Sequence, residues 1–372
     1  MSFGPGDDQH RDNRPEYAEF GTRRRTAGRG AVGLALACLA MAAVVVAVSH
    51  AGPRRPAQLP PVSVVSVGHP VLGITAGWQL FGLSQRSVVD IQLRTGRVIT
   101  TALPPPQGSG PVSFIVGPHA AIVRPLDDVT GYLVPDGSPA RPLTGTLARS
   151  GLLLPGPSAA QEWDTLGRPD SLILIGADGK PTGTRITLPG PWALQAAMPD
   201  GRGDVLVASN SGEQYDAGPH WLHTIGILPS AVGPRAWLGE TCTTAGCRDV
   251  VVDPLTGRHR VLPGVPPHLL TWPWPAYPGS VAPDGSVAAL VAGNSRGQVS
   301  LVEINLVTGA VRRLRVPVTQ STSSATMAWS PDSAWLFVVS TRGKLLAVAA
   351  RTGQVRTLGL SLPAVSQLGM RG

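Results

Sequence analysis

The sequence predicts an all-β protein, a seven-bladed β-propeller of four-stranded blades preceded by one transmembrane helix. Three observations predict this fold. Glycine and proline are abundant, with 45 and 37 residues in a chain of 372, and they separate short segments rich in Val, Leu and Thr, as turns separate strands. A strand-and-turn unit recurs about every 40 residues, a period typical of propellers. One long apolar run precedes the repeat.

The apolar run spans Gly30–Ser49 and contains no charged residue. A helix of this length crosses the roughly 30 Å hydrocarbon layer of a membrane. Four arginines between residues 23 and 29 precede the run, so we expect the N-terminus to be cytoplasmic and the larger C-terminal part to be extracellular. The expected order is a disordered cytoplasmic tail over 1–29, a transmembrane helix over 30–50, a Pro-rich stalk over 51–61 and the propeller domain over 62–372.

A cleaved signal peptide is the alternative for the N-terminus. Ser49-His50-Ala51 offers small residues where a signal peptidase would cut. The apolar run is longer than the core of about 7–15 residues that signal peptides usually have, which favours an uncleaved anchor. If cleavage occurs, the protein is secreted.

The repeat has two halves. In the first, an apolar strand meets a Thr-Gly or Asp-Gly turn and a second strand, because glycine supplies the positive φ of a tight hairpin. The hairpins are Val88–Leu103, Gly131–Leu143, Ser171–Leu188, Asp249–Leu262, Val299–Val316 and Leu345–Leu358. In the second half, a turn that is often Pro-Asp-Gly leads into an apolar strand, as at Met198–Ser209, Ala282–Ala292 and Trp329–Ser340.

Ordering these turns gives seven units, near 71–107, 108–147, 148–190, 191–226, 227–264, 265–318 and 319–362. Blades of four strands bury their faces against two neighbouring blades, which fits a closed ring. Two further segments, Val62–Val67 and Ala364–Leu368, have strand-like sequences. Either could pair with an end blade and cover its edge.

Two motifs carry a family resemblance. Trp329-Ser330-Pro331-Asp332 and Pro283-Asp284-Gly285, each leading into an apolar strand, resemble the bacterial WD40-like (PD40, TolB-type) propeller repeat. The Thr-Gly hairpins are similar to those of the seven-bladed lactonase and YVTN-type propellers. In this sequence Ser333 replaces the glycine of the motif. The resemblance implies the fold over roughly residues 70–360, while its families include binding partners, scaffolds and enzymes.

The basic charge does not indicate nucleic-acid binding. The formal net charge is +8, but Lys180 and Lys344 are the only lysines, so arginine supplies most of it. Such arginine use is typical of high-GC, actinobacterial-type composition. Basic residues do not cluster with aromatic residues, as RNA or DNA binding would require. We therefore expect no nucleic-acid partner.

Cys242 and Cys247 are separated by four residues, in a segment expected outside the membrane. Thiols oxidise in that environment, so the spacing predicts a local disulfide that closes a hairpin. A zinc site would need four ligands, and no other Cys or His stands at a suitable spacing. We expect no metal and no cofactor.

Two groups of residues could form binding sites. Glu162 and Asp164 flank Trp163, and alternation places both acids on one face of a strand. There they could act as a general acid and a general base. The favoured interpretation is that they are solvated turn acids beside a tryptophan that packs in the core. Trp272, Trp274 and Tyr277 alternate with prolines, which exclude regular sheet pairing. Exposed on a loop, these aromatic rings could stack on a sugar or a partner, or they could seal the join between two blades.

We identify no complete catalytic set in the sequence. The sequence thus favours a membrane-anchored, monomeric, non-enzymatic scaffold that binds an envelope protein or glycan. The alternative is a lyase or hydrolase acting on lactone-like or carbohydrate substrates at the centre of the ring.

Overall fold

A computed structural model describes part of one compact unit, Leu59–Gly372. The described residues are 61–104, 112–125, 130–143, 153–157, 161–164, 171–176, 180–187, 198–199, 202–208, 214–218, 221–224, 227–244, 246–265, 279–293, 299–319, 322 and 324–372. The predicted tail, transmembrane helix and nearly all of the stalk lie outside these residues. Within the described segments, no helix has the length and apolar character needed to cross a membrane.

The described residues form β-strands and two short 3-10 helices, Val71–Gly73 (η1) and Ser324–Thr326 (η4). The first sheet has the order β1-β4-β3-β2-β29. Its strands are β1 Val62–Ser66, β2 Gln79–Ser84, β3 Ser87–Gln92, β4 Arg97–Ala102 and β29 Val365–Arg371.

Four further sheets are four-stranded antiparallel meanders, each built from consecutive strands. The strands of the first two are β5 Val112–Val116, β6 Ala120–Pro125, β7 Tyr132–Pro135, β8 Arg141–Pro142, β9 Leu153–Pro155, β10 Gln161–Asp164, β11 Ser171–Gly176 and β12 Pro181–Thr187. Those of the other two are β13 Met198–Pro199, β14 Val205–Ala208, β15 Gln214–Gly218, β16 Trp221–Thr224, β25 Met327–Trp329, β26 Trp335–Val339, β27 Leu345–Ala349 and β28 Val355–Thr357.

The remaining sheet has eight strands and consists of two such meanders. Its strands are β17 Leu228–Val232, β18 Trp237–Thr243, β19 Gly246–Val252, β20 His259–Val261, β21 Gly279–Val281, β22 Val287–Gly293, β23 Val299–Asn305 and β24 Val311–Arg313. A short parallel pairing of β17 with β21 joins the two meanders, with Ala231 opposite Gly279 and Val232 opposite Ser280.

Buried contacts link each meander to the next in chain order. Apolar clusters connect β2 and β3 with β6 and β7, β5 and β6 with β11, β14 with β18 and β19, and β17–β19 with β21–β24. Between β10 and the β13–β14 turn, the indole Nε1 of Trp163 donates to the Gly203 carbonyl at 2.8 Å. Another cluster joins β22 and β23 to β25–β27. Each sheet is thus covered by the next, as blades of a propeller are.

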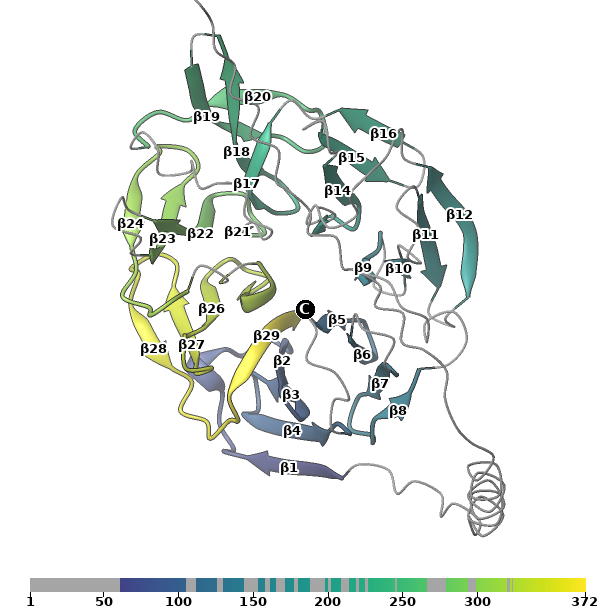
Figure 1. Cartoon of the computed structure of the whole chain (residues 1–372). Coiled ribbons are helices and arrows are strands. Elements are labelled where there is room, and N and C mark those ends of the chain that lie inside the picture. Colours follow the sequence, from purple (N-terminus) through teal and green to yellow (C-terminus); the bar gives the residue numbers. More distant parts are fainter. Residues whose placement is uncertain are drawn as a thin grey trace, which may run out of the picture. The chain divides into compact units, whose positions relative to one another are not determined.

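The last meander contacts the first sheet, so the series closes. Leu80 and Val89 of the first sheet pack in one cluster with Phe337 and Ala347 of β26 and β27. Figure 1 shows the sheets following one another around a common centre, toward which β29 runs. The described residues therefore form a β-propeller, and the all-β prediction is confirmed.

Both spare strands of the sequence take part in the first sheet. β29 pairs antiparallel with β2, and β1 pairs antiparallel with β4 at the opposite edge (Figure 1). The C-terminal strand thus completes a sheet whose other strands come from the start of the domain. We expected one segment or the other to cover an edge, and both segments do so.

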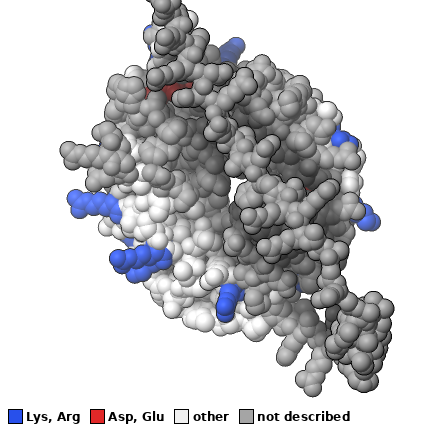
Figure 2. All heavy atoms as spheres, viewed as in Figure 1, with Lys and Arg blue, Asp and Glu red and all other residues white. Residues whose placement is uncertain are grey.

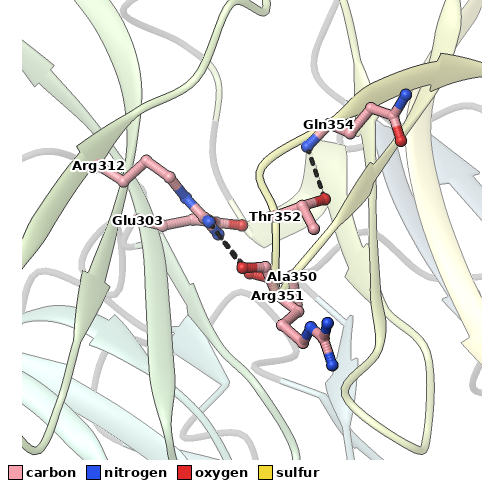
Figure 3. Close-up of polar contacts among 6 residues, drawn as sticks. All are labelled: Glu303, Arg312, Ala350, Arg351, Thr352 and Gln354. Atoms are coloured by element: carbon pink, nitrogen blue, oxygen red, sulfur yellow. Dashed lines mark hydrogen bonds and ion pairs between the residues drawn. The ribbon is translucent and has the colours of Figure 1, made fainter.

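A polar contact also crosses between neighbouring meanders. Arg312 of β24 donates through Nε to Glu303 of β23 at 2.9 Å and through Nη1 to the Arg351 carbonyl, in the β27–β28 turn, at 3.1 Å (Figure 3). Glu303 is buried, which raises the pKa of its carboxyl, while the Arg312 guanidinium acts in the opposite direction. This arginine therefore hydrogen-bonds one oxygen of a buried acid and also binds the backbone of the next meander.

Candidate functional site

Strand β10 carries the acidic doublet singled out in the sequence. Trp163 is fully buried and donates to Gly203 of the next meander, so its ring is not available to stack on a ligand. The interpretation of Trp163 as a packing residue is correct. Its role is to seal the contact between two sheets.

Asp164 is not the solvated turn acid that we favoured from the sequence. It ends β10 and is completely buried. Its Oδ2 lies 3.7 Å from Nη1 of Arg124, an equally buried residue on β6 of the preceding meander. The burial of one guanidinium beside one carboxylate explains why each is tolerated, because an isolated buried charge would be costly. Arg124 could not be recognised from the sequence, since its partner lies 40 residues away on another sheet.

Glu162 lies two residues before Asp164 on the same strand and is half-buried. Burial raises the pKa of its carboxyl to about 7, the Arg124 charge opposes the rise, and the Asp164 charge adds to it. Burial also lowers the pKa of the Arg124 guanidinium, against the effect of Asp164. The three residues form one coupled electrostatic group in which Glu162 can exchange a proton near neutral pH.

The aromatic group Trp272, Trp274 and Tyr277 lies outside the described residues, between β20 and β21.

The predicted disulfide is present: Cys242 and Cys247 are bonded, with their Cα atoms 4.0 Å apart. They stand directly opposite each other near the end of the β18–β19 hairpin, and both are exposed. The cysteines therefore close the hairpin as the sequence predicted.

A polar cleft of about 380 Å³ lies where the two halves of the eight-stranded sheet meet. The turn between β17 and β18 contributes Arg235, and the turn between β21 and β22 contributes Asp284 and Gly285. The β19–β20 segment contributes Asp253 and the consecutive residues Arg258, His259 and Arg260. Three arginines and a histidine thus line one concave site.

The two acids of the cleft are already engaged in their own turns. Asp253 accepts from the backbone N–H of Leu255 at 2.8 Å and the hydroxyl of Thr256 at 2.9 Å, and these bonds lower the pKa of its carboxyl. Asp284 accepts from the backbone N–H and the hydroxyl of Ser286, at 2.9 and 2.7 Å. These bonds from neutral donors leave both carboxylates ionised, so three arginines face two acids and the cleft keeps an excess of positive charge.

The arginines differ in how they are held. Arg260 donates to the carbonyl of Leu306 and is anchored across the two meanders. Arg235 and Arg258 are exposed, and their guanidinium groups form no ion pair with any residue that the structure describes. The cleft therefore presents one anchored guanidinium group and two that form no ion pair within the described part of the chain. These groups suit a carboxylate or phosphate, which they can bind through paired hydrogen bonds.

This cleft was not predicted from the sequence. The run Arg258-His259-Arg260 after the Thr-Gly turn and the Gly233-Pro234-Arg235 turn are visible in the sequence, but 22 residues separate Gly257 from Arg235. Only the pairing of the strands brings the segments together. On the face drawn in Figure 2, the described lysine and arginine side chains lie at separate points around the rim, without forming a continuous patch.

Comparisons with known proteins give structural similarities only. No protein-family model and no curated protein matches the chain. Among solved structures, a functionally unknown protein from Desulfotomaculum acetoxidans is 12% identical, with a TM-score of 0.47 over 78% of this chain and 98% of that chain. Apo AztD from Citrobacter koseri is 13% identical, with a TM-score of 0.45 over 79% and 98%. TolB from Acinetobacter baumannii is 13% identical, with a TM-score of 0.40 over 76% and 79%. None of these similarities bears on what the chain binds.

Proposed function

We propose that this protein is a non-enzymatic binding module of the cell envelope, whose propeller engages a partner bearing carboxylate or phosphate groups. The observation that carries the proposal is the cleft in which Arg235, Arg258 and Arg260 converge and outnumber its two acids. Guanidinium groups bind such oxyanions in a fixed planar geometry. An anionic envelope glycan and an acidic segment of an envelope protein share this chemistry.

The proposed architecture is a seven-bladed ring in which each four-stranded meander forms one blade. The first blade is completed by β29 and extended by β1. A monomer suffices, because the ring closes within one chain. The helix over 30–50 holds the module at the membrane, with the N-terminus in the cytoplasm and the propeller outside.

Binding measurements on the full-length chain in mild detergent test the proposal. The probes are an oligogalacturonate, a poly(glycerol phosphate) and an oligoglutamate peptide, which separate uronate, phosphate and peptide sources of negative charge. Changing Arg235→Gln and Arg258→Gln together removes two charged donors, each worth about 1.5 kcal/mol or more. We expect at least about a tenfold loss of affinity for the preferred probe, since about 1.4 kcal/mol corresponds to tenfold.

A matched control removes the same charge elsewhere. Arg94 and Arg342 are exposed and lie outside the cleft, so the Arg94→Gln, Arg342→Gln protein should keep its affinity. Equal losses in the two double variants would mean that general charge, not the cleft, attracts the probe. An absence of binding to all three probes would contradict the proposal outright.

Localisation has its own test. Protease added to intact cells should digest the propeller if it is extracellular, and a disrupted-cell control shows that the protease is active. The mass of the mature chain distinguishes the uncleaved anchor from a secreted product that begins near residue 52. A propeller protected in intact cells would overturn the proposed orientation.

The enzymatic alternative starts from Glu162. A carboxyl with a pKa of about 7 can act as a general acid or base at neutral pH. Its strand neighbour Asp164 is enclosed with Arg124, so it is not placed to serve as the second catalytic carboxylate. Turnover of lactones or glycosides that disappears in Glu162→Gln while binding at the cleft persists would favour this alternative.

A further inference from the structure

The β18–β19 hairpin gathers four potential metal ligands on one face. In the antiparallel register, Cys242 stands opposite Cys247 and Glu240 stands opposite Asp249. Side chains two residues apart on a strand point to the same side. Glu240 therefore shares its face with Cys242, and Asp249 shares it with Cys247.

Distances support the grouping of three of these four ligands. A carboxylate oxygen of Glu240 and the two sulfur atoms all lie within 4.8 Å of one another. Asp249 is the direct cross-strand neighbour of Glu240 in the hairpin, which places the fourth ligand beside the other three. The cysteines are exposed and the two acids are half-buried, so the group is open to solvent on its sulfur side.

We propose that reduction of the Cys242–Cys247 disulfide opens a zinc site formed by both cysteines, Glu240 and Asp249. A dithiol supplies the two electrons: the sulfur–sulfur bond breaks, two cysteine thiols form, and the dithiol becomes a disulfide. The cysteine thiols each lose a proton as Zn²⁺ binds. In the oxidised hairpin neither sulfur can act as a thiolate, so the bond keeps the site closed.

The ligand set selects the metal. Two thiolates and two carboxylates suit Zn²⁺, which takes four ligands at about 2.3 Å from sulfur and about 2.0–2.2 Å from oxygen. Thiolates disfavour Mg²⁺ and Ca²⁺, which prefer oxygen ligands. In the reduced protein, bound zinc would cross-link the two strands in place of the disulfide. The hairpin would then exist in two closed forms, one oxidised and one reduced with metal bound.

Zinc binding to the full-length chain in mild detergent tests the proposal. A Cys38→Ser background removes the third cysteine, which lies outside the described residues. The protein is reduced with a phosphine, desalted without oxygen, and titrated with Zn²⁺ against a coloured chelator. We expect one tightly bound zinc in the reduced protein and none in the oxidised protein. Co²⁺ in place of Zn²⁺ should show thiolate-to-metal charge-transfer absorption.

Variants assign the ligands. Changing Cys242→Ser and Cys247→Ser together should abolish binding, while Glu240→Gln and Asp249→Asn should each weaken it at least tenfold. Asp332→Asn removes an exposed acid of another sheet and should leave the affinity unchanged. Circular dichroism should show the same sheet content in reduced and oxidised protein, so that lost binding is not lost folding. Zinc bound equally in both redox states, or a reduced protein that binds no more zinc than the double cysteine variant, would overturn the proposal.

Discussion

Arg371 and Asp136 form an ion pair, with Nη1 of the arginine 2.7 Å from Oδ2 of the aspartate, although 235 residues separate them. Arg371 ends β29, and Asp136 lies in the turn between β7 and β8. The same guanidinium donates to Oε1 of Gln79 at 2.9 Å and lies over the ring of Phe81, 4.5 Å from its centroid. The C-terminal strand is thus attached to its own sheet and to the next one.

The attachment of β29 predicts a measurable cost. Arg371→Met keeps the length of the side chain but removes its charged hydrogen bonds, so we expect the free energy of unfolding to fall by about 1–3 kcal/mol. Deleting residues 363–372 also exposes the edge of β2 and should abolish cooperative unfolding. Urea unfolding of the full-length chain measures both effects. Exposed Arg342→Met serves as the control, and a change there should stay within about 0.5 kcal/mol.

Two glycines in equivalent Thr-Gly turns separate backbone strain from steric contact. Gly309 and Gly257 have similar positive φ values of 74° and 66°. A Cβ at Gly309 would lie 1.5 Å from the Pro263 carbonyl oxygen, whereas nothing lies within 4 Å of one at Gly257. We expect Gly257→Ala to cost about 1–2 kcal/mol from strain alone, and Gly309→Ala to cost clearly more. Equal losses of stability in the two variants, measured by thermal unfolding, would mean that the backbone around Pro263 moves away from the added Cβ at little cost.

The hairpins could be predicted because their information is local. The turns at Gly96, Gly257, Gly309 and Gly353 all carry the positive φ that the Thr-Gly pattern indicates. Ser333 shows why a departure from the pattern does not break it. This serine adopts φ 60° where the motif has glycine, and its hydroxyl accepts from the Asp284 N–H at 3.0 Å. A hydrogen bond to the neighbouring meander accompanies the strained backbone.

The contacts between sheets could not be predicted, because they depend on how strands distant in sequence meet. Arg124 and Asp164 each look unremarkable in the sequence, and only the packing of β6 against β10 brings them together. The cleft depends in the same way on the turns of two meanders. The alternation Glu240-x-Cys242 and Cys247-x-Asp249, by contrast, was visible. Its meaning depended on knowing that the two segments form one hairpin.

Removing Arg124 should be more harmful than removing an ordinary arginine. Arg124→Met leaves the fully buried Asp164 without its guanidinium neighbour, so we expect a loss of about 3–5 kcal/mol in the free energy of unfolding. Adding Asp164→Leu removes the second charge as well. The double variant should then lose less than the sum of the two single losses, which a double-mutant cycle measures. Additive losses would show that the two charges do not interact.

Stability should fall as the pH rises from about 5 to about 7.5, and Glu162 should account for part of the fall. The pKa of its carboxyl is about 7 in the folded protein against 4.5 ordinarily, so the folded state holds its proton more tightly than the unfolded chain does. That stabilisation is complete below the unfolded pKa and is lost as the pH rises through the folded pKa. Asp90, with a pKa raised to about 6 chiefly by burial, acts in the same direction.

Urea unfolding across this range should therefore show a shallower decline for Glu162→Gln than for the wild type. Asp253→Asn is the control, because hydrogen bonds lower the pKa of Asp253 and its contribution is lost only in more acidic solution. A wild-type stability that stays flat or increases over this range would contradict the protonated state assigned to Glu162.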